Sequence, residues 1–284
     1  MLKTFRKAFQ IEEIRKKIFY TFLMLIVVRI GSLLPTPGVD PTYIQEFFAA
    51  QTGDAFNFFN AFTGGSFEQM SIFALSITPY ITSSIIIQLL TIAIPKLEEM
   101  QKEGEDGRKK LAAFTRYGTV ILALIQSTAM AVGFGRSGLL VKYNFTNAAV
   151  VVLTLVAGSA FLMWVGERIT EKGVGNGISI VLLINILSSL PQDFVTLYER
   201  FIKRKTLVIA ATAVLVVVLI IVAIVVFVIL LQDGQRKIAV QYSQKIQGRK
   251  TMGGQSTFIP LKVNTAGVIP VIFASSLMQT PIIV

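Results

Sequence analysis

Long apolar segments alternate with short charged segments along this 284-residue chain. A helix needs about 20 mostly apolar residues to cross a bilayer. Seven segments approach or exceed this length, and we expect each of them to be a membrane-spanning helix. They are residues 18–34, 71–95, 117–134, 145–166, 173–191, 206–232 and 263–284. The pattern therefore predicts an all-α polytopic membrane protein.

The stretch just before the second predicted span, residues 60–71, does not fit a lipid-facing helix. It contains Gly64, Gly65, Glu68 and Gln69 among aromatic residues. Unpaired backbone groups are costly in lipid, so such a segment at membrane depth must be enclosed by protein or line a water-filled cavity. A broken helix beside a complete span is typical of a conduit rather than of an anchor. We interpret the chain as a membrane-embedded pore with a movable plug.

The composition supports a membrane protein and excludes several kinds of chemistry. Hydrophobic residues make up 53% of the chain and charged residues 15%, with a mean hydropathy of +0.67. Soluble domains hold about 25% charged residues. The chain has no cysteine and no histidine, so disulfides, thiol chemistry and the usual zinc ligands are absent.

The distribution of Lys and Arg predicts the orientation. Segments 1–17, 96–116, 167–172 and 233–262 together hold 20 of these residues. The intervening segments 35–74, 135–144 and 192–205 hold 6, and Arg29 completes the 27. The positive-inside rule then places the N-terminus in the cytoplasm. Residues 1–17 are typical of a basic amphipathic helix at the membrane surface. No small-residue cleavage site follows, so we expect the first span to be retained.

Arg29 is the one charged residue inside the predicted spans. One interpretation is that its side chain extends to the outer membrane surface, and the other is that it pairs with a neighbouring helix end or a polar pore wall. The lack of intramembrane carboxylates disfavours a protease or an ion-coupled carrier. We therefore predict no enzyme activity, no catalytic residues, no metal site and no cofactor. A secondary transporter with broken helices and a plain insertase remain the alternatives to a channel.

Three further patterns each allow two interpretations. Ile77, Ile81 and Ile85 share one helix face, which indicates either packing and lipid contact or a hydrophobic constriction that excludes ions. The run 172–177 predicts a tight turn that starts a helix, with Asn176 as its cap. The functional interpretation places this helix end at an interface that moves. Residues 233–262 predict a hairpin with strands at 238–242 and 255–261. Its basic residues reflect either the positive-inside rule or docking to an acidic partner such as ribosomal RNA or a motor protein.

Several long sequence strings add a specific resemblance to these patterns. They include GGSFEQMSIFALSITPYITSSIIIQLL, FLMWVGERITEKGVGNGISI and GGQSTFIPLKVNTAGVIPVIFASS. These strings resemble the SecY family, the central subunit of the bacterial Sec protein-conducting channel. The resemblance implies a SecY-type helical bundle of two pseudo-symmetric halves, with a half-helix plug before span two. Polypeptides would cross through its pore or leave sideways between spans two and seven.

The resemblance also implies a domain organisation. Residues 1–17 would be the cytoplasmic N-terminus, 18–190 the first half, 191–205 the external hinge, and 206–284 the start of the second half. Because the family continues for several more spans, we expect this chain to be a fragment or an incomplete subunit. The implied partners are the SecE and SecG subunits, the SecA motor ATPase or the ribosome, a signal-sequence-bearing polypeptide and the lipid bilayer.

Specific positions match the functional positions of the family. The implied pore ring is Ile77, Ile81, Ile178, Leu182 and Ile272. The implied plug includes Phe62, Gly64, Gly65 and Phe67. The implied lateral gate contains Gln88, Asn176 and Asn264. The implied docking surface for the cytoplasmic partner contains Arg236, Lys237, Arg249 and Lys250.

Overall fold

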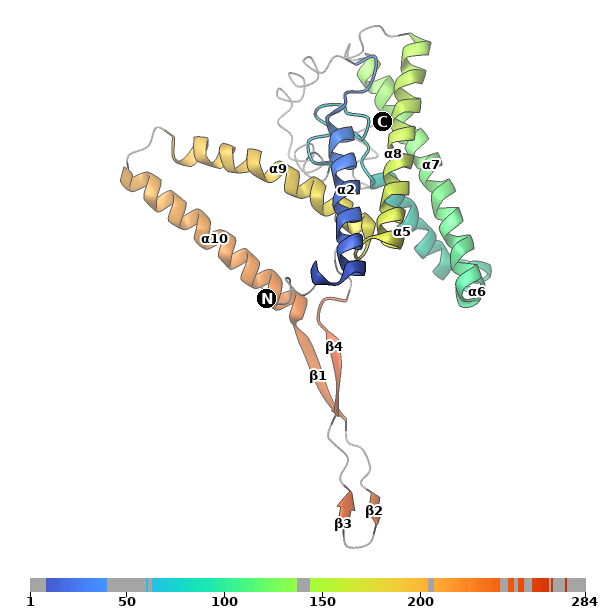
Figure 1. Cartoon of the computed structure of the whole chain (residues 1–284), viewed down its shortest axis with the longest axis vertical. Coiled ribbons are helices and arrows are strands. Elements are labelled where there is room, and N and C mark those ends of the chain that lie inside the picture. Colours follow the sequence, from blue (N-terminus) through green and yellow to red (C-terminus); the bar gives the residue numbers. More distant parts are fainter. Residues whose placement is uncertain are drawn as a thin grey trace. The chain divides into compact units, whose positions relative to one another are not determined.

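The fold consists of two compact units, Met1–Gln192 with Val271–Val284, and Asp193–Pro270. The computed structural model describes residues 9–39, 60, 63–136, 144–203, 207–240, 245–247, 250–252, 257–265, 267 and 274. Helices dominate the first unit, whereas the second unit combines helix with two short hairpin ladders (Figure 1).

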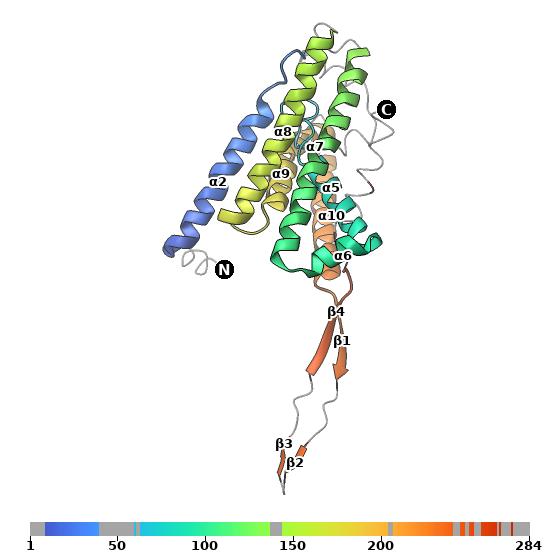
Figure 2. The same cartoon turned by 90° about the vertical axis from the view of Figure 1, so that its right-hand side faces the viewer.

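The first unit is a bundle of antiparallel helices. Its helices are α2 (Glu12–Leu33), α5 (Thr78–Ala93), α6 (Pro95–Lys102), α7 (Glu105–Arg136), α8 (Phe145–Lys172) and the first part of α9 (Gly177–Phe201). Helix α8 packs against α2 on one side and against α7 on the other, and α7 also packs against α5 (Figure 2). Helix α8 therefore lies between α2 and α7 in the first unit.

Four helices in the described part of the chain are long and apolar enough to cross a membrane, namely α7, α8, α9 and α10 (Leu207–Asp233). Helices α5 and α6 would add a fifth span if the pair, bent by 103°, is one broken span. The first predicted span, within the 22-residue helix α2, is not among them, because Arg29 adds to the charged residues at the start of this helix. The seventh predicted span, residues 263–284, lies almost wholly outside the described residues. The structure thus confirms a mostly helical membrane protein with fewer described spans than the pattern predicts.

The second predicted span begins later than expected. Turns occupy residues 64–77, except for an isolated bridge residue, and α5 starts only at Thr78. Pro79 lies in the first turn of α5, where its missing N–H needs no partner. Pro95 ends the helix at the other end, because the residue before a proline is pushed out of the helical conformation. Ile94 accordingly has extended backbone angles between α5 and α6.

Helix α9 continues beyond Pro191 to Phe201, where the sequence predicted an end at 191 and a connector over 192–205. A proline inside a helix removes one backbone hydrogen bond, but the residues after it keep apolar side chains at helical spacing. Phe194, Tyr198 and Phe201 provide this spacing. The predicted connector is therefore helical as far as Phe201.

Two apolar clusters form the core of the first unit. The first, which we call the upper cluster, joins Phe67, Met70, Ala74 and Leu75 to residues of α7 and α8. The second, which we call the ring cluster, joins Phe73 and Ile77 to residues of α2, α8 and α9. Residues 67–77 supply side chains to both clusters, so the non-helical segment lies at the centre of the packing.

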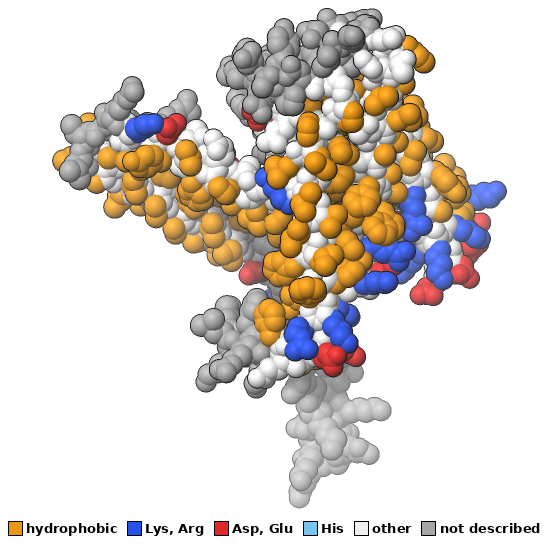
Figure 3. Space-filling model, turned by 45° about the horizontal axis from the view of Figure 1, so that its top comes forward, with side chains coloured by type: hydrophobic (Ala, Val, Ile, Leu, Met, Phe, Trp, Pro, Cys, Tyr) orange, Lys and Arg blue, Asp and Glu red, His pale blue; other side chains and the backbone are white. Residues whose placement is uncertain are grey.

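The surface separates apolar from charged regions. Figure 3 shows apolar side chains over the outer faces of the helices and charged side chains gathered in patches. Exposed ion pairs lie near the start of α2, between Lys16 and Glu12, and on α6, between Lys102 and Glu98. These are the ends that the charge distribution assigns to the cytoplasm.

The second unit contains the end of α9, helix α10, and four strands. They are β1 (Gln235–Val240), β2 (Lys245–Gln247), β3 (Lys250–Met252) and β4 (Thr257–Lys262). Strand β1 pairs antiparallel with β4, with Ile238 opposite Ile259, and β2 pairs antiparallel with β3. The predicted hairpin is present, although its first strand begins at Gln235 rather than at 238. Helix α10 is apolar all round, as expected for a membrane-spanning helix.

Candidate plug and pore site

Residues 63–77, which form turns from Gly64 onward, lie at the centre of the candidate site, and we call them the turn segment. Gly64 and Gly65 have φ angles of +65° and +81°, which glycine adopts without steric cost. Asn60 and Thr63 of the predicted half-helix plug are helical, and the two glycine corners are followed by turns through residue 70. Thr63, Gly64, Phe67 and Met70 are all buried. The enclosure by protein that the sequence requires is therefore present.

Backbone hydrogen bonds fasten the turn segment to the end of α2. The Thr36 N–H donates to the Met70 carbonyl at 2.9 Å, and the Ile72 N–H donates to the Leu34 carbonyl at 2.9 Å. These bonds satisfy buried backbone groups that would otherwise lie unpaired at membrane depth.

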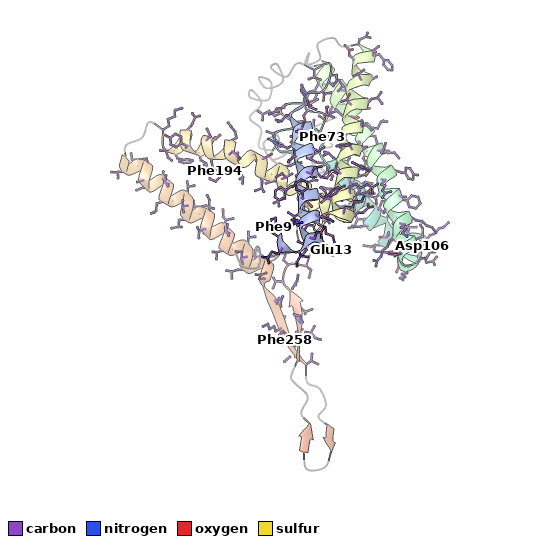
Figure 4. The ribbon with its side chains drawn as sticks, in the orientation of Figure 1. Phe9, Glu13, Phe73, Asp106, Phe194 and Phe258 are labelled. Carbon is purple, nitrogen blue, oxygen red and sulfur yellow. The ribbon has the colours of Figure 1, made fainter. Side chains whose placement is uncertain are left out.

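The turn segment also approaches α2 and α8 closely. A Cβ atom on Gly158 of α8 would lie 2.1 Å from the Ile72 carbonyl oxygen. A Cβ atom on Gly31 of α2 would lie 2.1 Å from the Phe73 ring. Phe73, labelled in Figure 4, stacks on Phe161 of α8 with ring centroids 5.9 Å apart. Glycines on the neighbouring helices thus make room for the segment.

A polar network connects the turn segment to α2 and α9. Arg29 Nη1 donates to the Gly64 carbonyl oxygen at 3.3 Å and to Ser188 Oγ at 3.1 Å. Asn185 Nδ2 donates to Ser76 Oγ at 3.1 Å, and Ser188 Oγ donates to the Asn185 carbonyl at 2.7 Å. Of the two interpretations of Arg29, the structure therefore shows pairing with neighbouring polar groups.

Four of the five predicted pore-ring residues belong to one apolar cluster. Ile77 is completely buried in the ring cluster, and Ile81, Ile178 and Leu182 pack against it while partly buried. Gly166 of α8 lies beside two of them, because a Cβ placed there would be 3.1 Å from Ile178 Cγ1 and 3.4 Å from Ile77 Cδ1. The fifth residue, Ile272, lies outside the described residues. The role of this set as a pore ring stays a prediction.

The predicted plug residues are partly described. Gly64 and Gly65 form the corners of the turn segment, and Phe67 is 6% exposed in the upper cluster. The Phe67 ring lies 6.4 Å from the ring of Phe134 on α7. Phe62 lies outside the described residues. Movement of these residues as a plug is untested by the geometry.

The predicted lateral-gate residues are divided between the two units. Gln88 is exposed on α5 in the first unit. Asn176 Oδ1 accepts from the Ile178 and Ser179 N–H groups at 3.1 and 3.4 Å, so it caps α9 as the sequence predicted. Asn264 belongs to the second unit, where its Oδ1 accepts from the Gly267 N–H at 3.0 Å. Their joint role in a gate stays a prediction.

The predicted docking residues lie on the hairpin of the second unit. Arg236 and Lys237 are exposed on β1, and Lys237 Nζ lies 4.7 Å from the centre of the Phe258 ring on β4. Lys250 begins β3, while Arg249 lies outside the described residues. The described hairpin thus presents cations and apolar side chains together.

Sequence reasoning missed the partners that hold the turn segment. Ser76, Asn185 and Ser188 contribute to the polar network, and the polar content of span five was the available signal. Within the part of the chain that the structure describes, no three acidic side chains gather as they would for a metal ion. The described residues of the site provide enclosure by apolar side chains and polar fastening of the turn segment.

The fold and the site together define a polytopic helical membrane protein with a buried, glycine-cornered segment beside an apolar cluster. A comparison with protein families matches residues 71–284 to SecY. The chain is 46% identical over 271 residues to the protein translocase subunit SecY of Pseudomonas aeruginosa, covering 95% of this chain and 61% of the relative. The SecY of Bacillus subtilis is 47% identical over 297 residues, covering 99% and 66%. This chain belongs to the SecY family, whose bacterial members are multi-pass proteins of the cytoplasmic membrane.

Solved structures support the same fold. One described as the structure of a protein conducting channel matches with a TM-score of 0.57 and 18% identity, covering 95% of this chain and 57% of that chain. A second, Sec61 in the canine ribosome-channel complex from the endoplasmic reticulum, matches with a TM-score of 0.54 and 19% identity, over 95% and 58%. The chain spans 61% to 66% of the length of the two curated relatives named above.

Proposed function

We propose that this chain forms part of a protein-conducting channel that moves unfolded secretory polypeptides across the membrane and releases membrane segments into the lipid. The observation that carries the proposal is the burial of the turn segment against the cluster that contains Ile77, Ile81, Ile178 and Leu182. Apolar side chains suit this task, because they exclude hydrated ions when the pore is empty. They also seal around any passing sequence without binding it. The channel performs no chemical reaction.

The partners follow from the same family membership. SecE and SecG would complete the membrane complex, and the SecA motor ATPase or the ribosome would deliver the polypeptide with its signal sequence. The exposed cations Arg236 and Lys237 support docking of an acidic partner at the hairpin, together with Arg249 and Lys250. Gln88, Asn176 and Asn264 would line the exit into the lipid.

Site-specific photocrosslinking to an arrested, partly translocated polypeptide tests the channel. A photoreactive residue at Ile81 or Ile178 should crosslink to the polypeptide when introduced into the complete subunit assembled in membranes. The matched control is Ile121 on α7, which is 60% exposed and should crosslink to lipid instead. Equal crosslinking at all three positions, or none at Ile81 and Ile178, would contradict the proposal.

The same experiment separates the alternatives. A secondary transporter predicts saturable flux of a small solute and no crosslink to a translocating polypeptide. A plain insertase predicts crosslinks to hydrophobic membrane segments, but none to the hydrophilic part of a secretory polypeptide that is crossing the membrane. A channel predicts that the hydrophilic part contacts Ile81 and Ile178 in succession as the polypeptide lengthens.

A further inference from the structure

Arg29 is a cation on the apolar part of α2 whose side chain turns inward to the turn segment. Its Nη1 atom lies 3.3 Å from the Gly64 carbonyl oxygen, 3.1 Å from Ser188 Oγ and 3.3 Å from Ser32 Oγ. Gly64 is 35 residues away in the chain and Ser188 is 159 residues away. One guanidinium thus joins α2, the turn segment and α9, all within the first unit.

Arg29 is the main hydrogen-bond donor to the Gly64 carbonyl oxygen among the described residues. Ser188 Oγ lies 3.3 Å from this carbonyl and 2.7 Å from the Asn185 carbonyl. A hydroxyl carries one hydrogen, and the shorter contact to Asn185 is the better bond. Without Arg29, the buried Gly64 carbonyl would therefore compete with Asn185 for that hydrogen. A buried acceptor without a donor is unfavourable.

The arrangement leaves Arg29 with partners when the turn segment is displaced. Ser188 and Ser32 belong to helices, so their hydroxyl groups remain available to the guanidinium after Gly64 has moved. The cation is then not left unpaired at membrane depth, where an unpaired charge is costly. Displacement breaks the bond to Gly64 while the two helices stay connected through Arg29 and Ser188. A contact with these properties can be broken and remade.

We propose that Arg29 is a positioning residue that fastens the Gly64 corner of the turn segment to α2 and α9, and so holds the plug in its closed position. The proposal deepens the channel function and rests on it for the word plug, but the fastening itself can be tested separately. A hydrogen bond to a charged group changes an equilibrium constant by roughly tenfold or more. The 3.3 Å distance places this bond at the weak end, so we expect a change of about tenfold.

Cysteine labelling measures the fastening directly, because these 284 residues contain no cysteine and any cysteine elsewhere in the complete subunit can be replaced. Ser66 lies in the turn segment with 3% of its surface exposed, so a Ser66→Cys variant should react slowly with a water-soluble maleimide. Adding Arg29→Met, which removes every donor, should raise the labelling rate about tenfold. Ser188→Ala should raise it less, because Arg29 still donates to Gly64. The experiment uses the complete subunit assembled in membranes.

Ser189→Ala is the matched control, because Ser189 Oγ donates to the Ile186 carbonyl at 2.9 Å on the same helix. It should leave the labelling rate unchanged. If Arg29→Met reduces accumulation of the protein, Arg29→Lys decides, because it keeps the cation but loses the planar fork. The Arg29→Lys variant should then label faster than the parent, but by less than about tenfold. A labelling rate equal to the parent's in every Arg29 and Ser188 variant that accumulates overturns the proposal.

A second readout distinguishes failure of the fastening from failure of the channel function. Ion leak through the resting complex in vesicles should rise with the labelling rate in the Arg29→Met variant. Faster labelling without any leak would show that Arg29 fastens the segment but that the segment does not seal a pore, which would contradict the plug role of the segment and leave the fastening intact. Unchanged labelling alongside normal crosslinking at Ile81 would contradict the fastening alone.

Discussion

Replacement of Gly64 by alanine gives a sharp test of how the turn segment is held. Gly64 has a φ of +65°, and an alanine Cβ there would lie 2.6 Å from the Asn185 carbonyl oxygen and 2.7 Å from Ser188 Oγ. Ordinary contact begins at 3.4 Å, so the segment or α9 must shift by about 0.8 Å. Gly65 is a nearly ideal control, because its φ is +81° but a Cβ there meets nothing within 4 Å.

The expected magnitudes follow from these two positions. An L-residue in the left-handed region costs about 1–2 kcal/mol, and both substitutions carry this cost. Overpacking adds about 1–3 kcal/mol at Gly64 alone. The difference corresponds to about 5- to 150-fold in the ratio of displaced to seated segment. We therefore expect Gly64→Ala to increase ion leak through the resting channel far more than Gly65→Ala does.

Leak is measured in vesicles that hold equal amounts of the assembled complex, with protease resistance of the subunit as a check on folding. The double substitution Gly64→Ala with Ser188→Ala should recover part of the seal, because it removes one of the two clashing atoms. The reasoning is refuted if Gly64→Ala and Gly65→Ala leak equally in folded complexes. It is equally refuted if removing the Ser188 hydroxyl makes no difference to the Gly64→Ala variant.

Two further predictions concern packing and docking. Gly158→Ala on α8 should destabilise the protein by about 1–3 kcal/mol, because its Cβ would lie 2.1 Å from the Ile72 carbonyl oxygen. An alanine Cβ at Gly133 on α7 meets nothing within 4 Å, so Gly133→Ala should be neutral or stabilising by about 0.5–1 kcal/mol. Melting temperatures in detergent compare the two variants. An equal loss of melting temperature in both would contradict the close packing at Gly158. Lys237→Glu should weaken binding of the ribosome or SecA more than Lys262→Glu, at the base of the hairpin, does. The difference between the two variants should be larger at low salt. Equal binding of both variants in co-sedimentation would show that Lys237 is not a docking residue.

The parts of the fold that could be predicted are those set by long apolar runs. Helices α7, α8 and α10 follow from their length and hydropathy, and the enclosure of Gly64 follows from the cost of exposing its backbone to lipid. The Asn176 cap follows from a local rule that links a side chain to the next turn. The helices and the cap depend on residues near one another in the sequence, which is why the pattern alone was sufficient for them.

The parts that could not be predicted depend on contacts between distant residues. The choice between the two interpretations of Arg29 required the positions of Gly64 and Ser188, and no local pattern contains them. The late start of α5 depends on Met70 and Ser76, which have φ angles of +43° and +53°. Neither residue type favours this conformation. Both are 1% exposed, so the surrounding packing holds a strained backbone that the sequence alone gives no reason to expect.

The same burial explains how a plug can be both stable and movable. Phe67 and Met70 are 6% and 1% exposed, and removing each from the core costs about 1.5–3 kcal/mol. Together this is about 3–6 kcal/mol, close to the roughly 5.5 kcal/mol that shifts an equilibrium from 1:99 to 99:1. In the proposed channel, an apolar signal segment that replaces these contacts would supply much of this free energy. The polar bonds at Gly64 contribute less but depend on geometry, so they fix where the segment returns when the signal segment leaves.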